Sequence, residues 1–361
     1  MKKKIKILLV AMMLLFLFGC SDRRKENENT ADQPSEASEN KEVEKEPETI
    51  EDLTDYKTAP FKVTCNETIK IRNNSSTSGS VKGYVRKGDY FEVYETKENE
   101  GYVWSRIGPD AWIANDGTWL KRVSYDTEFK IPDCDLLVLK ELPNKIEGTF
   151  YSTSGGSLYT KGNETYTISK DTNGMISKVM RYQNAESNYL DENLQEHVEK
   201  EERTDELWYA LRFGVSPFLY QNNTYNNETV FKYDDHGNLT YVGNKGNLSS
   251  TEYTYNSNDK LISTFDTYHN DDYTTSRTYT YKDGLLVKIE QSSADPTGDE
   301  FSNGVMEINE LEYNGNLIFC TATYAGMILD DTDYFFRIDD KGRIIEEYEI
   351  HMGWHDWLYS Y

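Results

Sequence analysis

Between residues 61 and 123, apolar side chains recur at every second position in short runs, and turn residues separate these runs. Such runs occupy residues 69–71, 90–94 and 102–107, and a turn around Gly88 precedes the second of them. Alternation with a period of two places apolar side chains on one face of a β-strand. About five short strands within roughly 60 residues predict a small β-barrel.

A second pattern repeats along the rest of the chain. Each copy has two large apolar residues, mostly aromatic, separated by one residue, then a short turn rich in Asp, Asn and Gly, then aliphatic residues. The copies begin at Tyr166, Phe231, Tyr253, Tyr279, Leu311 and Phe336. The Asp/Asn-Gly turns suit tight hairpins, and a spacing of about 22–32 residues between later copies leaves room for two strands in each. The pattern predicts a long antiparallel β-meander.

One stretch within this region has helical spacing instead. Leu190, Leu194 and Val198 recur every four residues, and residues 207–211 form a second apolar face. This spacing predicts a helical insertion at about residues 188–213. The expected fold class is therefore mainly β: a small SH3-like barrel followed by a large antiparallel β-meander sheet of repeated hairpins, with one helical insertion.

The first 59 residues follow neither pattern. Four lysines within the first six residues precede twelve uninterrupted apolar residues at positions 7–18. This apolar core is too short to span a bilayer, which needs about 20 residues, and it fits a secretory signal peptide. Residues 21–59 are rich in Glu, Asn, Lys and Ser and almost free of aromatic residues, so we expect a disordered tether there.

Charge is distributed unevenly along the chain. The net charge of −24 argues against nucleic acid as a partner. Residues 61–123 contain ten basic and eight acidic residues, whereas residues 124–361 carry a net charge of −23. This contrast predicts a domain boundary near residue 123. The expected parts are a signal peptide (1–19), an acidic tether (20–59), a barrel (60–123) and an acidic tyrosine-rich β-repeat domain (124–361).

The end of the signal peptide carries a recognisable motif. Leu17-Phe-Gly-Cys20-Ser resembles the lipobox of bacterial lipoproteins. The resemblance implies that Cys20 receives a diacylglyceryl group and that the preceding residues are removed. Two acyl chains suit stable anchoring, because a single chain binds a membrane only marginally. We therefore expect a lipid-anchored protein on the extracellular face of the bacterial cell membrane.

The predicted barrel carries a second resemblance. Ile69-Lys-Ile-Arg72, Val81-Lys-Gly83, Lys87-Gly-Asp89, Gly101-Tyr-Val-Trp104 and Trp112-Ile113 together resemble a bacterial SH3 domain. The resemblance implies a groove for short extended peptides, which in bacterial members are often peptidoglycan peptides or cross-bridges.

The aromatic residues of this module exceed what the core of a 60-residue barrel needs. We expect some of them to line the groove: Tyr84, Tyr90, Tyr102, Trp104, Trp112 and Trp119. An alternative is that these side chains pack against the acidic domain, since aromatic residues are enriched in both kinds of interface.

The hairpin repeats are similar to tyrosine-rich Rhs/YD repeats, and Tyr233-Asp234 preserves the Tyr-Asp pair of that motif. We expect the repeat sheet to serve as a display or interaction surface.

An enzymatic interpretation starts from Asp133-Cys134-Asp135, which resembles the nucleophile segment of NlpC-type cell-wall cysteine peptidases. A thiolate nucleophile needs an activating imidazole, and none of the histidines at positions 197, 236, 269, 351 and 355 has that family's sequence context. A structural role for Cys134 is preferred. His351 and His355 have the four-residue spacing of a helical metal site, but no third ligand is evident. We expect no catalytic residue, no metal and no cofactor.

The chain has four cysteines, at positions 20, 65, 134 and 320. With Cys20 lipidated, at most one disulfide can form. A bridge between Cys65 and Cys134 is favoured because these residues flank one module, although sequence alone cannot establish the pairing.

Two classes of function follow from these observations. The preferred hypothesis is a non-enzymatic surface lipoprotein whose SH3-like module binds peptidoglycan peptide or a surface protein. The alternative is a peptidoglycan hydrolase with an unrecognised catalytic domain in residues 124–361.

Overall fold

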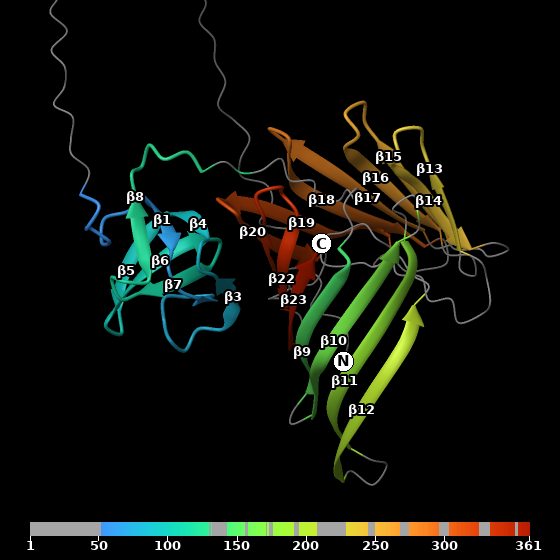
Figure 1. The fold of residues 1–361 in the computed structure, drawn as a ribbon, viewed down its shortest axis with the longest axis horizontal. Helices are drawn as coiled ribbons and strands as arrows, with labels where there is room; N and C mark the ends of the chain where they lie inside the picture. Colours follow the sequence, from blue (N-terminus) through green and yellow to red (C-terminus); the bar gives the residue numbers. More distant parts are fainter. Residues whose placement is uncertain are drawn as a thin grey trace, which may run out of the picture. The chain divides into compact units, whose positions relative to one another are not determined.

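The computed structural model describes residues 52–129, 131, 143–155, 158–170, 172, 176–190, 195–207, 229–244, 250–267, 274–295, 303–324, 333–350 and 353–361. These residues belong to one compact unit, and all of their secondary-structure elements are β-strands (Figure 1). The expectation of a mainly β, antiparallel fold is confirmed. Within the described ranges, no helix has the length and apolar character needed to cross a membrane.

Eight short strands form what we call the N-terminal module, residues 61–123. They pair into two sheets, ordered β4-β1-β8 and β3-β2-β7-β6-β5. Alternating side chains such as Phe61, Val63, Ile71 and Ile113 are fully buried between these sheets. The strands are β1 (Phe61–Cys65), β2 (Ile69–Arg72), β3 (Val81–Val85), β4 (Tyr90–Val93), β5 (Glu95–Asn99), β6 (Tyr102–Gly108), β7 (Ala111–Asn115) and β8 (Leu120–Val123).

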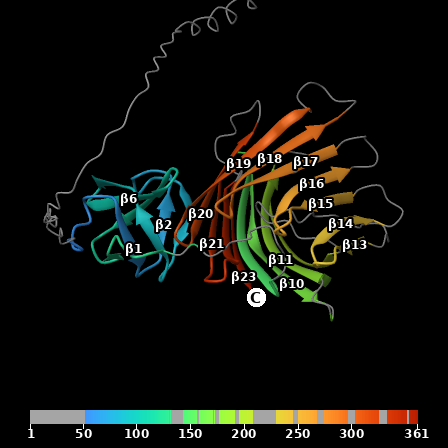
Figure 2. The same ribbon diagram turned by 90° about the horizontal axis from the view of Figure 1, so that it is seen from above.

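Fifteen further strands form one antiparallel sheet, called the large sheet below, with the order β12-β11-β10-β9-β23-β22-β21-β20-β19-β18-β17-β16-β15-β14-β13. Figure 2 shows that this sheet is strongly curved. Its strands are β9 (Lys145–Gly155), β10 (Leu158–Lys170), β11 (Ile176–Leu190), β12 (Glu196–Leu207), β13 (Thr229–Tyr233), β14 (Leu239–Asn244), β15 (Ser250–Tyr255), β16 (Leu261–Thr267), β17 (Thr274–Lys282), β18 (Leu285–Ala294), β19 (Gly304–Asn314), β20 (Leu317–Tyr324), β21 (Asp333–Ile338), β22 (Ile344–Ile350) and β23 (Gly353–Ser360).

The repeated sequence pattern has a local physical cause at the hairpin turns. The side chains of Asp234, Asn256 and Asp339 each accept hydrogen bonds from the backbone N–H groups two and four residues further along. An Asp or Asn at the start of a turn stabilises it in this way. Tyrosine then links successive hairpins, because the hydroxyl of Tyr255 donates to the carbonyl of Leu239, 2.9 Å away, in the preceding hairpin.

The helical insertion expected at residues 188–213 is wrong wherever the structure describes that stretch. Residues 188–190 end β11, and residues 196–207 form β12, which pairs with β11 along its whole length. Residues 191–194 and 208–213 lie outside the described residues. The side chain of Val198 is 61% exposed and that of Leu190 is 41% exposed. The four-residue spacing thus marks no buried helical face, and strand pairing overrides a weak local pattern.

The N-terminal module shares its core with the large sheet. Four sheet residues, Leu317, Phe319, Phe335 and Tyr348, belong to the same buried cluster as the module's own core. Glycine permits the contact, because a Cβ atom on Gly108 would lie 2.6 Å from the ring of Phe319. The equivalent distance from Gly83 to the Phe335 ring is 2.8 Å. The module is therefore packed against the sheet through interlocking apolar side chains.

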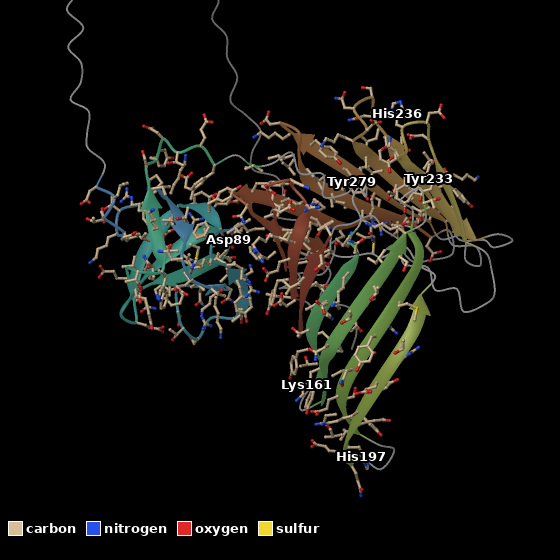
Figure 3. All side chains as sticks on the ribbon, in the orientation of Figure 1. Asp89, Lys161, His197, Tyr233, His236 and Tyr279 are labelled. Carbon is tan, nitrogen blue, oxygen red and sulfur yellow. The ribbon has the colours of Figure 1, made fainter. Side chains whose placement is uncertain are left out.

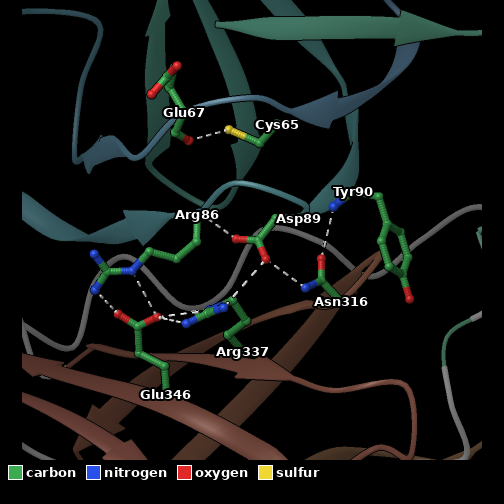
Figure 4. Close-up of polar contacts among 8 residues, drawn as sticks. All are labelled: Cys65, Glu67, Arg86, Asp89, Tyr90, Asn316, Arg337 and Glu346. Carbon is green, nitrogen blue, oxygen red and sulfur yellow. Dashed lines mark hydrogen bonds and ion pairs between the residues drawn. The ribbon is translucent and has the colours of Figure 1, made fainter.

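The turn between β19 and β20 completes this junction. Only Gly315 and Asn316 join the two strands, and the tip contacts the outer edge of β4 (Figure 4). The Asn314 amide accepts a hydrogen bond from the N–H of Glu92 at 2.7 Å and donates to the Glu92 carbonyl at 2.8 Å. It also donates to the Ile107 carbonyl at 2.7 Å. Asn316 accepts from the N–H of Tyr90 at 3.0 Å.

These contacts solve a specific problem of the module. Strand β4 lies at the edge of the β4-β1-β8 sheet, so its outward backbone groups lack a partner strand there. Buried backbone groups need hydrogen-bond partners, and the two asparagine amides supply them as a neighbouring strand would. Gly315 is required at the tip, because a Cβ atom there would lie 1.8 Å from the Tyr90 carbonyl oxygen.

We expect Asn314→Ala to lower the free energy of unfolding by about 2–4 kcal/mol, because buried N–H and C=O groups on Glu92 and Ile107 lose their partner. Urea denaturation of the full mature chain measures this change. Asn256→Ala is the matched control, because Asn256 is an exposed turn asparagine at another hairpin and its loss should cost about 1 kcal/mol or less. Equal losses in the two variants would contradict a special role for the β19–β20 tip.

Candidate functional site

A hollow on the N-terminal module is the best candidate for a binding site. Its cavity volume is about 690 Å³. Strand β2, the segment before it, strands β6 and β7 and the segment before β8 supply its walls. The lining residues are Asn66, Glu67, Thr68, Ile69, Lys70, Arg72, Thr77, Tyr102, Trp104, Ala114, Thr118 and Trp119.

Three aromatic side chains form one wall of this cavity. The rings of Tyr102 and Trp119 lie 5.9 Å apart and are tilted by 30°, and Trp104 meets Tyr102 edge-on at 6.3 Å. Trp104 is only 1% exposed, and its indole N–H donates to the Asn99 carbonyl at 3.0 Å. Trp104 is therefore a fixed support, while Tyr102 and Trp119 are the partly exposed surfaces that a ligand can contact.

Charged side chains border the aromatic wall. Lys70 and Arg72 follow each other on the outward face of β2, and Glu67 lies just before that strand. The Arg72 guanidinium donates to the Gly79 carbonyl at 2.6 Å, which holds its orientation. A cavity with two cations, one carboxylate and an aromatic surface suits a short peptide that carries a carboxylate and polar amide groups.

The structure divides the six aromatic residues that sequence reasoning selected. Tyr102, Trp104 and Trp119 line the cavity. Tyr84 contacts the large sheet, because its ring lies edge-on to Tyr348 at 6.1 Å. The backbone of Tyr90 is bound by Asn316, and its ring lies 5.0 Å from that of Phe129.

Trp112 is not among the lining residues; it is half-buried on β7, opposite Arg72 and Arg106 in the strand register. The six aromatic residues are thus divided among the cavity wall, the contact with the large sheet and, for Trp112, neither of these places.

Sequence reasoning missed the charged lining residues. The alternation Ile69-Lys-Ile-Arg72 already places Lys70 and Arg72 on the opposite face from the buried isoleucines, so the signal was present. Glu67 and Thr118 gave no such signal, because they lie in turns that only the folded chain brings together.

Cys65 lies directly behind the cavity wall and is not bridged. Its thiol is 2% exposed and donates to the carbonyl of Glu67 at 2.9 Å. The structure shows Cys65 as a free thiol, and Cys134, the partner favoured from the sequence, lies outside the described residues. Burial raises the pKa of the Cys65 thiol to about 11, which keeps it protonated and unreactive at neutral pH.

The residues considered for catalysis do not gather in the described part of the chain. His197 on β12 and His236 in the β13–β14 turn lie in different parts of the large sheet (Figure 3). His355 lies in strand β23, where its ring stacks on Trp357 at 5.7 Å and its Nδ1 lies 3.7 Å from a Glu349 carboxylate oxygen. Cys20, Cys134, His269 and His351 lie outside the described residues.

The large sheet has a smaller hollow of about 390 Å³ on strands β9 to β12. Its two lysines, Lys161 and Lys200, both lie near the Glu186 carboxylate, at 3.0 Å and 3.5 Å. Lys161 is labelled in Figure 3. These lysines already have a charged partner, so the module cavity is the stronger candidate for a ligand site.

Comparisons with known proteins leave the chain without an assigned family. No family model matches the sequence, and no curated protein matches it. Among solved structures, a porin-like protein from Bacteroides uniformis is similar with a TM-score of 0.26 and 10% identity. That similarity covers 55% of this chain and 62% of the porin-like chain, so the match spans less than two thirds of that protein's length.

We expect peptide mapping of the native mature chain under non-reducing conditions to recover Cys65 as a thiol. It should resist a thiol-alkylating reagent at pH 8 in the folded protein, because it is buried and protonated there. The same reagent should label Cys65 fully in urea, which serves as the control. Recovery of a peptide in which Cys65 is linked to Cys134 would contradict the free thiol.

Proposed function

We propose that this chain is a non-enzymatic cell-surface lipoprotein whose SH3-like N-terminal module binds a short cell-wall peptide. Cys20 carries the lipid anchor in this proposal, and residues 21–59 act as a tether that holds the folded part above the membrane. The large sheet provides a display or interaction surface.

The cavity beside Tyr102 and Trp119 is the observation that carries this proposal. An extended peptide can lay its backbone or methyl groups on the aromatic wall, where each contact excludes water. Lys70 and Arg72 line the same cavity as the aromatic wall, where they can bind the carboxylate of a peptide. Guanidinium–carboxylate hydrogen bonds are strong and directional. The SH3-like sequence pattern independently points to peptide binding.

The location of the cavity also supports peptide binding, because the large sheet does not block it. The opposite side of the module is covered by the large sheet through Phe319 and Phe335. The cavity is lined by residues of the module alone, and its β6 residues Tyr102 and Trp104 lie at the other end of that strand from Gly108, which contacts Phe319. A ligand can therefore reach Trp119 without displacing the sheet.

We expect Trp119→Ala to weaken binding to purified peptidoglycan by about tenfold or more, because a central aromatic contact of an interface is lost. A soluble form of the mature chain, which begins at Ser21 and therefore carries no lipid, is mixed with peptidoglycan. The bound fraction is measured after sedimentation. Trp112→Ala is the matched control, since Trp112 lies on the same module outside the cavity.

Thermal unfolding of both variants establishes that they are folded. If the wild-type chain stays in the supernatant at low and moderate salt, the wall-binding proposal is wrong. Equal loss of binding in the Trp119 and Trp112 variants would place the binding site elsewhere. Release of soluble wall fragments during incubation would contradict the non-enzymatic assignment.

We expect Cys20→Ser to move the protein from the membrane fraction to the medium, because the thiol that accepts the lipid is lost. Cell fractionation with immunoblotting measures the distribution, and metabolic labelling with a radioactive fatty acid should mark the wild type alone. Cys65→Ser is the control and should remain in the membrane fraction. A Cys20→Ser chain that stays fully membrane-bound and uncleaved would indicate an uncleaved apolar anchor instead.

A further inference from the structure

Charged side chains meet where the N-terminal module contacts strands β21 to β23 of the large sheet. Glu346 is fully buried and accepts hydrogen bonds from Arg337 Nε at 2.8 Å and Arg337 Nη2 at 2.6 Å. Arg86 of the module binds the same carboxylate (Figure 4). Asp89, also buried, lies 3.9 Å from Arg337 and accepts a hydrogen bond from Asn316 at 2.8 Å.

A third carboxyl group makes this cluster unbalanced. Asp356 Oδ2 lies 3.8 Å from Arg86 Nη2, so Asp356 and Glu346 compete for one guanidinium. With Asp89 included, three carboxyl groups surround two arginines. Asp356 Oδ1 is buried and, among the described residues, accepts no hydrogen bond. A hydrogen bond between the Asp356 and Glu346 carboxyl groups needs a proton on one of them, because two ionised carboxylates have no donor.

The groups that face Asp356 come from five elements. Strand β9, paired with β23, contributes Lys145 and Glu147, which pair with each other at 2.5 Å. The module contributes Tyr84 and Arg86 from β3 and its end, and Asp89 from the turn before β4. Strand β21 contributes Arg337, and β22 contributes Glu346 and Tyr348. Strand alternation places Glu347, Glu349 and His355 on the opposite face of the sheet. None of the facing groups supplies the positive charge that would balance the third carboxylate.

We infer that the junction is a proton-dependent latch: one proton held between Asp356 and Glu346 keeps the N-terminal module docked on the large sheet, and loss of that proton loosens the module.

The direction of the effect follows from the docked and undocked environments of Asp356. Burial, and then the nearby Glu346 charge, raise the pKa of Asp356 to about 6, from an ordinary value of 3.8. A carboxyl group that binds its proton more tightly in the docked state favours docking at low pH and disfavours it as pH rises through the raised pKa. Glu346 lies on the paired strand β22 and acts on Asp356 in both states, and Arg86 of the module opposes the shift, so the pH dependence of docking comes from the burial that docking adds. Between pH 5 and pH 7, the docking equilibrium should weaken by about threefold to tenfold. Burial also raises the pKa of Asp89, which acts in the same direction.

The edge of β4 supplies a local probe of docking. The N–H groups of Tyr90 and Glu92 are protected by the side chains of Asn316 and Asn314, which belong to the large sheet. The N–H of Phe91, by contrast, points to β1 within the module. Site-resolved hydrogen exchange of the full mature chain, corrected for the intrinsic pH dependence of exchange, reports the opening equilibrium at these two amides.

We expect the protection factors of Tyr90 and Glu92 to fall by about threefold to tenfold from pH 5 to pH 7, while that of Phe91 changes less. Asp356→Asn keeps the shape of the side chain and cannot ionise, so its protection at Tyr90 and Glu92 should change by less than about twofold. Glu347→Gln is the matched control. It removes a buried carboxyl on the opposite face, whose pKa burial raises to about 8, and it should leave the wild-type change in place.

Wild-type protection factors that stay constant between pH 5 and pH 7 would overturn the latch. An unchanged pH dependence in Asp356→Asn would also overturn it, since another group would then be responsible. If Glu347→Gln abolishes the change, the effect is one of global stability and the latch is wrong. Far-ultraviolet circular dichroism at both pH values establishes that each variant remains folded.

Discussion

The backbone edge of β4 is the constraint on which the rest of this structure depends. A strand at the edge of a small sheet presents N–H and C=O groups that either face water or need a partner. Here the partner is a pair of asparagine side chains at a hairpin tip, and Asn314 lies 222 residues further along the chain than Glu92, to which it binds. Because the same hairpin inserts Leu317 and Phe319 into the module's core, polar satisfaction and apolar burial occur at one place.

This junction decides which surfaces remain available for function. The side of the module that contacts the sheet is occupied by apolar rings and by the ion pairs around Glu346. The cavity lined by Trp119 and Lys70 contains no residue of the large sheet and remains open to a ligand. The buried charges at the junction are costly to desolvate, so their arrangement sets how firmly the module is held. A single unbalanced carboxyl group can therefore make the attachment sensitive to pH.

The large sheet shows how much of the fold a local sequence pattern can predict. The side chains of Asp234, Asn256 and Asp339 stabilise their turns within four residues, and alternating aromatic residues such as Tyr253 and Tyr255 lie on one face of the strand before the turn. These effects are local, so the hairpins could be predicted from the sequence. Strand β12 shows the limit, because its residues pair with β11 although they are exposed and strongly charged. No periodicity marked it as a strand, and the apolar spacing in that stretch indicated a helix.

The sequence by itself determined that the chain is mainly β, where its turns fall, and which residues of the module have alternating inward and outward faces. Those properties depend on neighbours within a few positions. Only the tertiary structure decided that Tyr84 and Tyr90 meet the large sheet while Tyr102 and Trp119 line a cavity, and that Cys65 is an unbridged thiol. These outcomes depend on contacts between residues far apart in the chain, such as Asn314 with Glu92, and no local pattern encodes such a pairing.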